Sequence, residues 1–245
     1  MHKIHTFILL IFFIYASLLL LVYADDVPQV VEVNGIWQGS FDINGKGPFD
    51  FTAIHVDGQS TAVSHAAKTL CTGEVSAAGD PYVAKYQMYA LDGAPFDHAT
   101  ISGTLANQQI DSQFVTEAAG DTGVLTLSYN PLYEQDSSLE LLQGAWQFTD
   151  RDGLEIEWKI NQGVIQGKDS DQCEYSGEIA LINPDFNAYA VNVQIKACSS
   201  VNGEYRGLAY LDDTESLALK TDMAGSFYGF HFDLQKAATV ASKIL

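Results

Sequence analysis

The chain has 245 residues, of which 31 are acidic and 12 basic, giving a formal net charge of −19 at pH 7. Such a surface repels phosphate backbones and anionic lipid headgroups, which argues against nucleic acid or an anionic membrane surface as a partner. The apolar fraction of 47% is typical of a globular protein and argues against disorder. The acidity is interpreted as a feature that keeps the protein soluble.

Residues 1–24 have the organisation of a secretory signal peptide. A weakly basic start with Lys3 precedes an apolar run, and the small residue Ala24 stands before Asp25. We expect an exported protein, secreted or periplasmic, that is cleaved after Ala24 and then has no membrane contact. The alternative is an uncleaved tether, because the apolar run at 7–23 reaches the lower length limit for spanning a bilayer.

The remainder of the chain is an internal repeat. The sequence Gly35-Ile36-Trp37-Gln38 returns as Gly144-Ala145-Trp146-Gln147, and Cys71, Gly73 and Glu74 return as Cys173, Gly177 and Glu178. Such regular spacing indicates one structural unit written twice. We therefore expect repeat 1 at 35–130, a polar linker at 131–143, repeat 2 at 144–235 and a tail at 236–245.

Both copies alternate apolar and polar residues with the period of a β-strand. In the first copy Trp37, Gly39, Phe41 and Ile43 share one parity. In the second, Leu154, Ile156, Trp158 and Ile160 alternate with Glu155, Glu157 and Lys159. Eight short strands are predicted in the second copy, near 144–149, 154–160, 163–167, 172–182, 188–197, 203–212, 216–221 and 225–235.

Short turns between these strands predict antiparallel neighbours in an up-and-down order. A meander of eight strands with one apolar face can close on itself and so remove its exposed edges. The expected fold class is all-β, with two tandem antiparallel barrel-like or sandwich domains of about eight short strands each.

A Gly-x-Trp motif on the first strand of such a meander resembles the lipocalins and their calycin relatives. The resemblance covers Gly35 to Trp37, Gly144 to Trp146 and the strand count of each copy. It implies a small apolar ligand inside one or both barrels, contacted by Trp37 and Trp146. The pattern of a cysteine, Ser-Gly-Glu and a second cysteine also resembles uncharacterised exported bacterial proteins, which implies no activity.

The most specific chemical feature is the pair Cys173 and Cys198. An exported chain permits disulfides, and the turn at 183–187 lies midway between the two cysteines, so a hairpin brings them within bridging distance. The pairing that aligns the apolar faces places Cys173 opposite Ala197, and a bulge beside Cys198 would correct this. The alternative is two buried free thiols.

Cys71 is the odd cysteine, and the sequence aligns it with Cys173. The position that would match Cys198 falls near Ala94, which cannot pair. We expect a buried, inert thiol; an intermolecular disulfide or a reactive nucleophile is the alternative.

No other cluster points to chemistry. His55, His65, His98 and His231 lack metal-ligand spacing, and no catalytic or phosphate-binding motif occurs. The acidic residues Asp150, Asp152, Asp169 and Asp171 lack the order of a calcium loop and are expected at hairpin turns. The prediction is no metal, no cofactor and no catalytic residue.

Two functions fit these observations. The first is a non-enzymatic exported or cell-envelope protein with a structural or interaction role, whose partner is an envelope protein. The alternative is lipocalin-like binding of a small apolar ligand, contacted by Trp37, Trp146 and Trp158. We expect filled barrels, because many large aromatic residues point inward, and the tryptophans are then core residues.

Overall fold

The computed structural model describes residues 33–150, 152–214 and 217–237. The predicted signal peptide and the part of the tail beyond residue 237 lie outside the described residues. Within those ranges, no helix is both long and apolar enough to cross a membrane.

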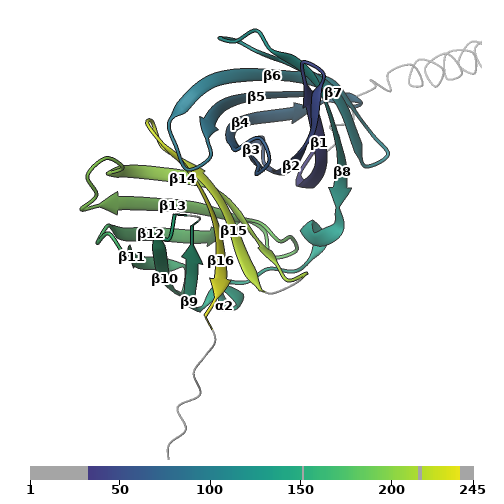
Figure 1. Cartoon of the computed structure of the whole chain (residues 1–245). Coiled ribbons are helices and arrows are strands. Elements are labelled where there is room, and N and C mark those ends of the chain that lie inside the picture. The colour runs from purple at the N-terminus through teal and green to yellow at the C-terminus, as the bar shows by residue number, and fades with distance from the viewer. Residues whose placement is uncertain (1–32, 151, 215–216, 238–245) are drawn as a thin grey trace, which may run out of the picture.

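The first copy is a closed antiparallel barrel whose eight strands follow sequence order (Figure 1). Eight residue pairs between the first and last strands close it, from Ile36 with Asn130 to Ile43 with Gly123. The strands are β1 (Gly35–Ile43), β2 (Lys46–Val56), β3 (Gln59–Ser64), β4 (Thr69–Ala77), β5 (Pro81–Ala90), β6 (Pro95–Ala106), β7 (Gln109–Thr116) and β8 (Thr122–Asn130).

The second copy is also a closed eight-stranded barrel. Its seam is short, because the first and last strands pair only at Gln147 with Gln235 and Trp146 with Lys236. The strands are β9 (Gly144–Thr149), β10 (Glu155–Asn161), β11 (Val164–Asp169), β12 (Glu174–Leu181), β13 (Tyr189–Lys196), β14 (Gly203–Asp212), β15 (Ala218–Ala224) and β16 (Gly229–Lys236).

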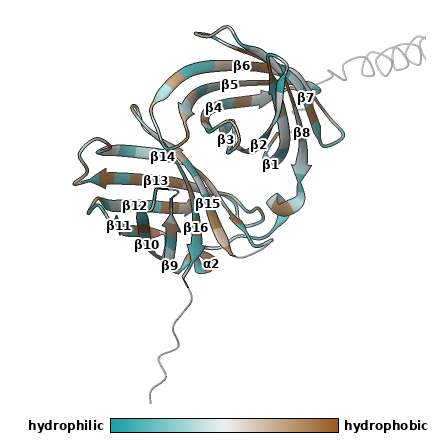
Figure 2. Ribbon diagram, in the orientation of Figure 1, coloured by the Kyte–Doolittle hydropathy of each residue, from teal (hydrophilic) through white to brown (hydrophobic). Residues whose placement is uncertain are grey.

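The predicted all-β class with two eight-stranded units is therefore confirmed, and the barrel is the form that the units take. On β10, for example, Ile156, Trp158 and Ile160 are buried, whereas the residues between them are exposed. Figure 2 shows hydrophobic and hydrophilic residues alternating along many strands. This alternation is why each strand buries one face in the barrel and leaves the other to solvent.

The segment between the barrels is more buried than a polar linker would be. It contains the 3-10 helix η2 (Pro131–Glu134) and the short helix α2 (Leu139–Leu142). Leu132 and Tyr133 of η2 are buried in an apolar cluster with side chains of both barrels, and Leu142 joins the core of the second barrel. The segment is therefore part of the packing between the barrels.

The two barrels pack directly against one another. Strands β3 and β4 of the first contact β14, β15 and β16 of the second. In the turn between β5 and β6, Gly93 exchanges two backbone hydrogen bonds with Gly229 of β16, at 3.1 and 2.9 Å. Strand β9 pairs only with the C-terminal end of β16, and the turn with Gly93 pairs with the N-terminal end.

Candidate binding sites inside and between the barrels

Trp37 and Trp146 occupy equivalent positions in the two barrels. Both indoles point inward and are buried, with 2% and 0% exposure. Each Nε1 donates to the carbonyl oxygen four residues earlier, Val33 at 3.0 Å and Leu142 at 2.7 Å. The first-strand tryptophans thus join each core to the chain segment that enters the barrel.

Trp158 lies deep in the second barrel and is also fully buried. Its ring packs edge-on to Phe232, with centroids 5.5 Å apart, and lies 6.2 Å from Tyr175. Its Nε1 has no hydrogen-bond partner in the described part of the chain. The second interior contains seven buried aromatic residues among its aliphatic ones, namely Trp146, Trp158, Tyr175, Tyr189, Tyr205, Phe230 and Phe232.

The first barrel is filled less completely. Strand pairing places Ala53 where the second barrel has Trp158, because Ala53 pairs with Trp37 as Trp158 pairs with Trp146. A cavity of about 50 Å³ remains, with Phe41, Phe51, Cys71, Met88, Phe114 and Leu125 among the residues that line it. That volume is far below the ~300 Å³ of a pocket for a drug-sized ligand.

A buried polar network occupies the other part of the first interior. His55 Nδ1 lies 2.8 Å from Ser60 Oγ, which lies 2.6 Å from the Tyr86 hydroxyl; His55 Nε2 lies 3.3 Å from the Tyr82 hydroxyl. Burial lowers the pKa of His55 to about 3, so the imidazole is neutral. A neutral ring with one donor and one acceptor satisfies both neighbours.

At the equivalent position the second barrel has an apolar pair, because Ile160 and Ile165 pair where the first barrel pairs His55 with Ser60. This polar pair inside the first barrel is not among the residues predicted from the sequence to form a site. The alternation of the strand could have indicated it. His55 is separated by even numbers of residues from Phe51 and Ala53, so its ring is expected on the inward face with them.

Cys71 is a buried free thiol, as expected, but its alignment with Cys173 was wrong. Ala53 and Trp158, which are equivalent, pair on the next strand with Ala62 and Gly167. Those residues pair in turn with Cys71 and Tyr175, so Tyr175 and not Cys173 is the equivalent of Cys71. Burial raises the pKa of Cys71 to about 12, which keeps the thiol protonated.

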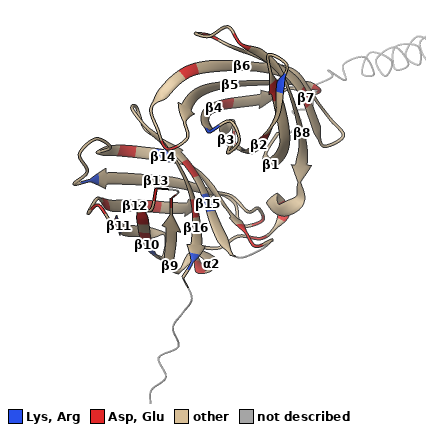
Figure 3. Ribbon diagram, viewed as in Figure 1, with Lys and Arg blue, Asp and Glu red and all other residues tan. Residues whose placement is uncertain are grey.

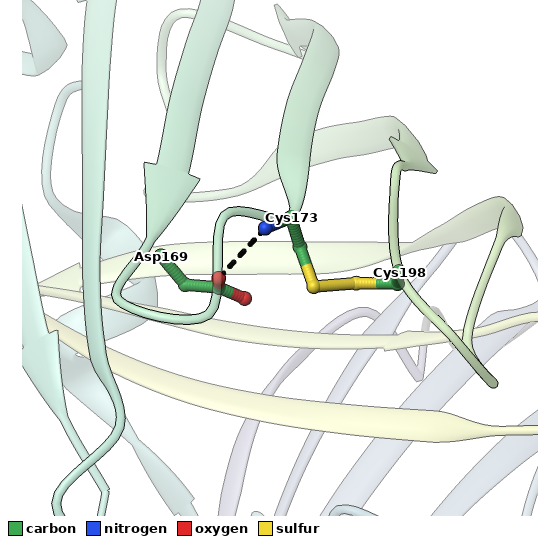
Figure 4. Close-up of side chains that lie close together, drawn as sticks. All are labelled: Asp169, Cys173 and Cys198. Atoms are coloured by element: carbon green, nitrogen blue, oxygen red, sulfur yellow. Dashed lines mark hydrogen bonds between the residues drawn. A yellow bond between two sulfur atoms is a disulfide. The ribbon is translucent and has the colours of Figure 1, made fainter.

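The disulfide between Cys173 and Cys198 is present, with the two Cα atoms 4.8 Å apart (Figure 4). The ladder of β12 and β13 ends at Glu174 with Lys196, and Ala197 then adopts a φ of 60°. This irregular residue provides the predicted correction of register, so that Cys198 rather than Ala197 faces Cys173.

Asp169 holds the loop that carries Cys173. Its Oδ1 accepts from the backbone N–H of Cys173, and its Oδ2 accepts from the Tyr175 hydroxyl, both at 2.9 Å. Because both oxygens have donors and both sulfurs are bonded to each other, this cluster does not fit a metal ion. Asp150 likewise accepts from the N–H groups of Asp152 and Leu154, as expected of a turn residue.

The space between the barrels is larger than the interior cavity. A groove of about 650 Å³ runs between β3 and β4 of the first barrel and β12, β13 and β14 of the second. The polar and charged residues that line it include Gln59, Thr61, Thr72, Glu74, Glu178, Asn192 and Arg206.

Glu74 and Glu178, which match in the repeat, contribute one exposed carboxylate from each wall of the groove. Arg206 is paired with Glu204 at 2.8 Å. Figure 3 shows acidic residues spread over both barrels with few basic ones between them. The charged groups of the groove are therefore mainly carboxylates, and they lie among apolar residues such as Val191 and Leu208.

Trp37 also lines a second cleft, of about 520 Å³, at one end of the first barrel. Tyr129, Tyr133 and Phe186 lie beside it, and the rings of Tyr133 and Phe186 stack with centroids 4.9 Å apart. Of the three tryptophans expected to contact a ligand, Trp37 is thus at the edge of a surface cleft, whereas Trp146 and Trp158 lie in a filled core.

Comparisons of the chain with protein-family models, with curated proteins and with solved structures found no match.

Proposed function

We propose that the chain is a non-enzymatic exported or cell-envelope protein in which two filled barrels form a scaffold that binds a partner at its surface. The observation that carries this proposal is the distribution of space. The cavity inside the first barrel measures about 50 Å³, whereas the groove between the barrels measures about 650 Å³ and has a carboxylate on each wall. Packed interiors favour a structural role for the barrels.

Export is part of the proposal. The N-terminal sequence is typical of a signal peptide cleaved after Ala24, and the disulfide supports an oxidising compartment such as the periplasm or the cell exterior. An uncleaved membrane tether is the alternative. N-terminal sequencing of the mature protein distinguishes the two.

Partner binding in the groove is tested by chemical crosslinking in the native host. The variant Glu74→Gln with Glu178→Gln removes one carboxylate from each wall, and Glu155→Gln with Glu157→Gln makes the same charge change on exposed sites of β10. We expect the groove variant to lose a crosslinked partner that the control variant retains. Equal crosslinking by both variants contradicts the assignment of the groove.

Binding of a small apolar ligand is the second candidate, favoured by the apolar lining of the cavity in the first barrel. Native mass spectrometry of protein purified from its own host tests it. Extra mass that disappears when Met88 or Phe114 is replaced by a smaller residue supports the ligand, and the bare polypeptide mass supports filled barrels.

A further inference from the structure

Two histidines from different barrels meet at the junction between them. His65 lies in the turn between β3 and β4, His231 lies on β16, and their ring centroids are 4.8 Å apart in an edge-to-face arrangement. On the far side of His231, Nδ1 lies 2.6 Å from Asp222 Oδ1 on β15. We call His65, His231 and Asp222 the histidine junction.

His231 is 5% exposed, and its Nε2 is buried without a hydrogen-bond partner among the described residues. Its backbone N–H donates to Asp92 Oδ1 at 3.0 Å, and the backbone N–H of His65 donates to Asp50 Oδ2 at 3.0 Å. The junction is therefore fixed by hydrogen bonds on both sides. His231 pairs with Asp222, whereas His65 forms no ion pair with another residue that the structure describes.

Several charged or titratable groups surround the two rings. Tyr228 adds one more link between the barrels through a hydrogen bond from its hydroxyl to the carbonyl of Asp92. The groups that interact electrostatically with the two rings are Asp50 on β2, Asp92 in the turn between β5 and β6, Lys220 and Asp222 on β15, and Asp233 on β16. Asp222 also interacts with Tyr210 on β14 and, from inside the first barrel, with Cys71 on β4.

The surroundings shift the pKa values of the two histidines in opposite directions. Burial opposes a charge on His231, but the attraction and hydrogen bond of Asp222, together with Asp92 and Asp233, raise its pKa. Burial and then the charge on His231 lower the pKa of His65, and attraction to Asp50 and Asp222 opposes this only in part. The junction therefore accepts one proton readily and resists a second.

We propose that acid loosens the histidine junction, because a second positive charge on His65 repels protonated His231, and that this reshapes the groove between the barrels. Strands β3 and β4 carry both a wall of the groove and the turn with His65, so movement at the junction changes the separation of the walls. The consequence for partner binding rests on the function proposed above; the movement does not.

Proton linkage gives the direction in which pH shifts the equilibrium between the closed and open forms of the junction. When the junction opens, His65 returns towards its ordinary value near 6.5, so the open form binds a proton that the closed form does not. The closed form is favoured above pH 6.5 and loses stability as pH falls below it, with the ratio of open to closed forms rising up to about tenfold per pH unit. Asp222, which raises the pKa of His231, belongs to the same barrel and stays beside it when the junction opens, so the pH dependence originates mainly at His65.

The test is a distance measured across the groove of the full-length mature protein. Spin labels are attached to Ser76→Cys on β4 and Ser176→Cys on β12, two exposed sites on groove-lining strands, while Cys71 is buried and the other cysteines are bonded. Pulsed electron paramagnetic resonance then reports the separation of the labels between pH 7.5 and 4.5. We expect a longer or broader distribution to develop below pH 6.5.

The variant His65→Gln removes the second charge and is expected to abolish the change, whereas His98→Gln, an exposed histidine on β6, is expected to leave it intact. Circular dichroism at each pH confirms that both barrels remain folded. An unchanged distribution, or a change that persists in His65→Gln, overturns the inference. Because no partner is needed, a groove that moves but captures nothing contradicts the proposed function alone.

Discussion

Lys236 Nζ lies 5.1 Å from the centroid of the Trp146 ring and donates to the carbonyl of Leu141 at 2.7 Å. In the first barrel Tyr129 has the same relationship to Trp37, with ring centroids 5.4 Å apart. Strand pairing confirms the equivalence, because Lys236 pairs with Trp146 and Tyr129 with Trp37. Each barrel thus covers its first-strand tryptophan with a residue from the end of its last strand.

This arrangement predicts a large difference between two variants of the second barrel. Trp146→Ala leaves a cavity in a filled core, so we expect the free energy of unfolding to fall by ~3–5 kcal/mol. Lys236→Met keeps the aliphatic contact and loses the cation–π attraction together with the exposed hydrogen bond to Leu141, so we expect a loss of about 1 kcal/mol. Denaturant unfolding followed by tryptophan fluorescence measures both. If Trp146→Ala instead released a bound ligand with little change in stability, the filled-barrel interpretation would be wrong.

Much of the fold was predictable because each strand can be identified from the alternation of apolar and polar residues within it. The alternation of Ile156, Trp158 and Ile160 with exposed residues identifies a strand and its buried face without any other part of the chain. The disulfide was predictable for a similar reason, since one hairpin turn lies midway between its cysteines. The repeated tryptophan then located the start of each barrel.

What the sequence did not reveal depends on contacts between elements far apart in the chain. On β3 the residues from Ser60 to Ser64 are all buried, because the face that would meet solvent meets the second barrel. His65 and His231 are distant in sequence and carry no motif, so only packing of the barrels brings them together. The alignment of Cys71 with Cys173 failed because matching residue types does not count strand pairs.

The disulfide is predicted to stabilise the second barrel mainly by restricting its unfolded chain. The bond closes a loop with a sequence separation of 25 residues, for which the loop-entropy model gives about 3.5 kcal/mol. We expect Cys173→Ser with Cys198→Ser to lower the free energy of unfolding by about that amount, and Cys71→Ala to leave the bond intact. Peptide mapping without reduction identifies the bonded pair, and a bond that includes Cys71 would contradict the structure.

The buried network of the first barrel predicts acid sensitivity that originates at His55. The pKa of His55 is about 3 in the folded protein and near 6.5 in the unfolded chain, so only the unfolded chain binds a proton there between these values. The free energy of unfolding is therefore unaffected above pH 6.5 and decreases progressively as pH falls from 6.5 towards 3. The loss reaches up to roughly 5 kcal/mol at pH 3. Replacing His55 and Ser60 by the isoleucines that the second barrel uses is expected to flatten this dependence, as measured by urea unfolding at several pH values.

The matched control for that variant is His98→Gln, which changes an exposed histidine of the same barrel. It is expected to retain the full loss of stability between pH 6.5 and 3. If the variant with two isoleucines loses stability with acid as steeply as the parent, His55 is not the group responsible. The readout is unfolding of the first barrel, which separates this effect from movement at the histidine junction.

Two buried threonines, one in each barrel, carry hydroxyls without a hydrogen-bond partner among the described residues. Thr221 lies inside the second barrel with 0% exposure, and Thr61 lies on β3 at the contact between barrels with 4%. A buried hydroxyl with no partner is unfavourable by ~1–3 kcal/mol, and valine has nearly the same shape and the same preference for strands. We therefore expect Thr61→Val and Thr221→Val each to raise the free energy of unfolding by about 1 kcal/mol.

Denaturant unfolding of each single variant and of the double variant tests this expectation. The two effects should add, because the sites are in different barrels and share no partner. Thr126→Val is the control, since that exposed hydroxyl donates to Asp111 Oδ1 at 3.1 Å and its loss brings no gain. A decrease in stability for either buried site would mean that an ordered water satisfies its hydroxyl, and the valine would then have displaced a favourable contact rather than removed an unfavourable one.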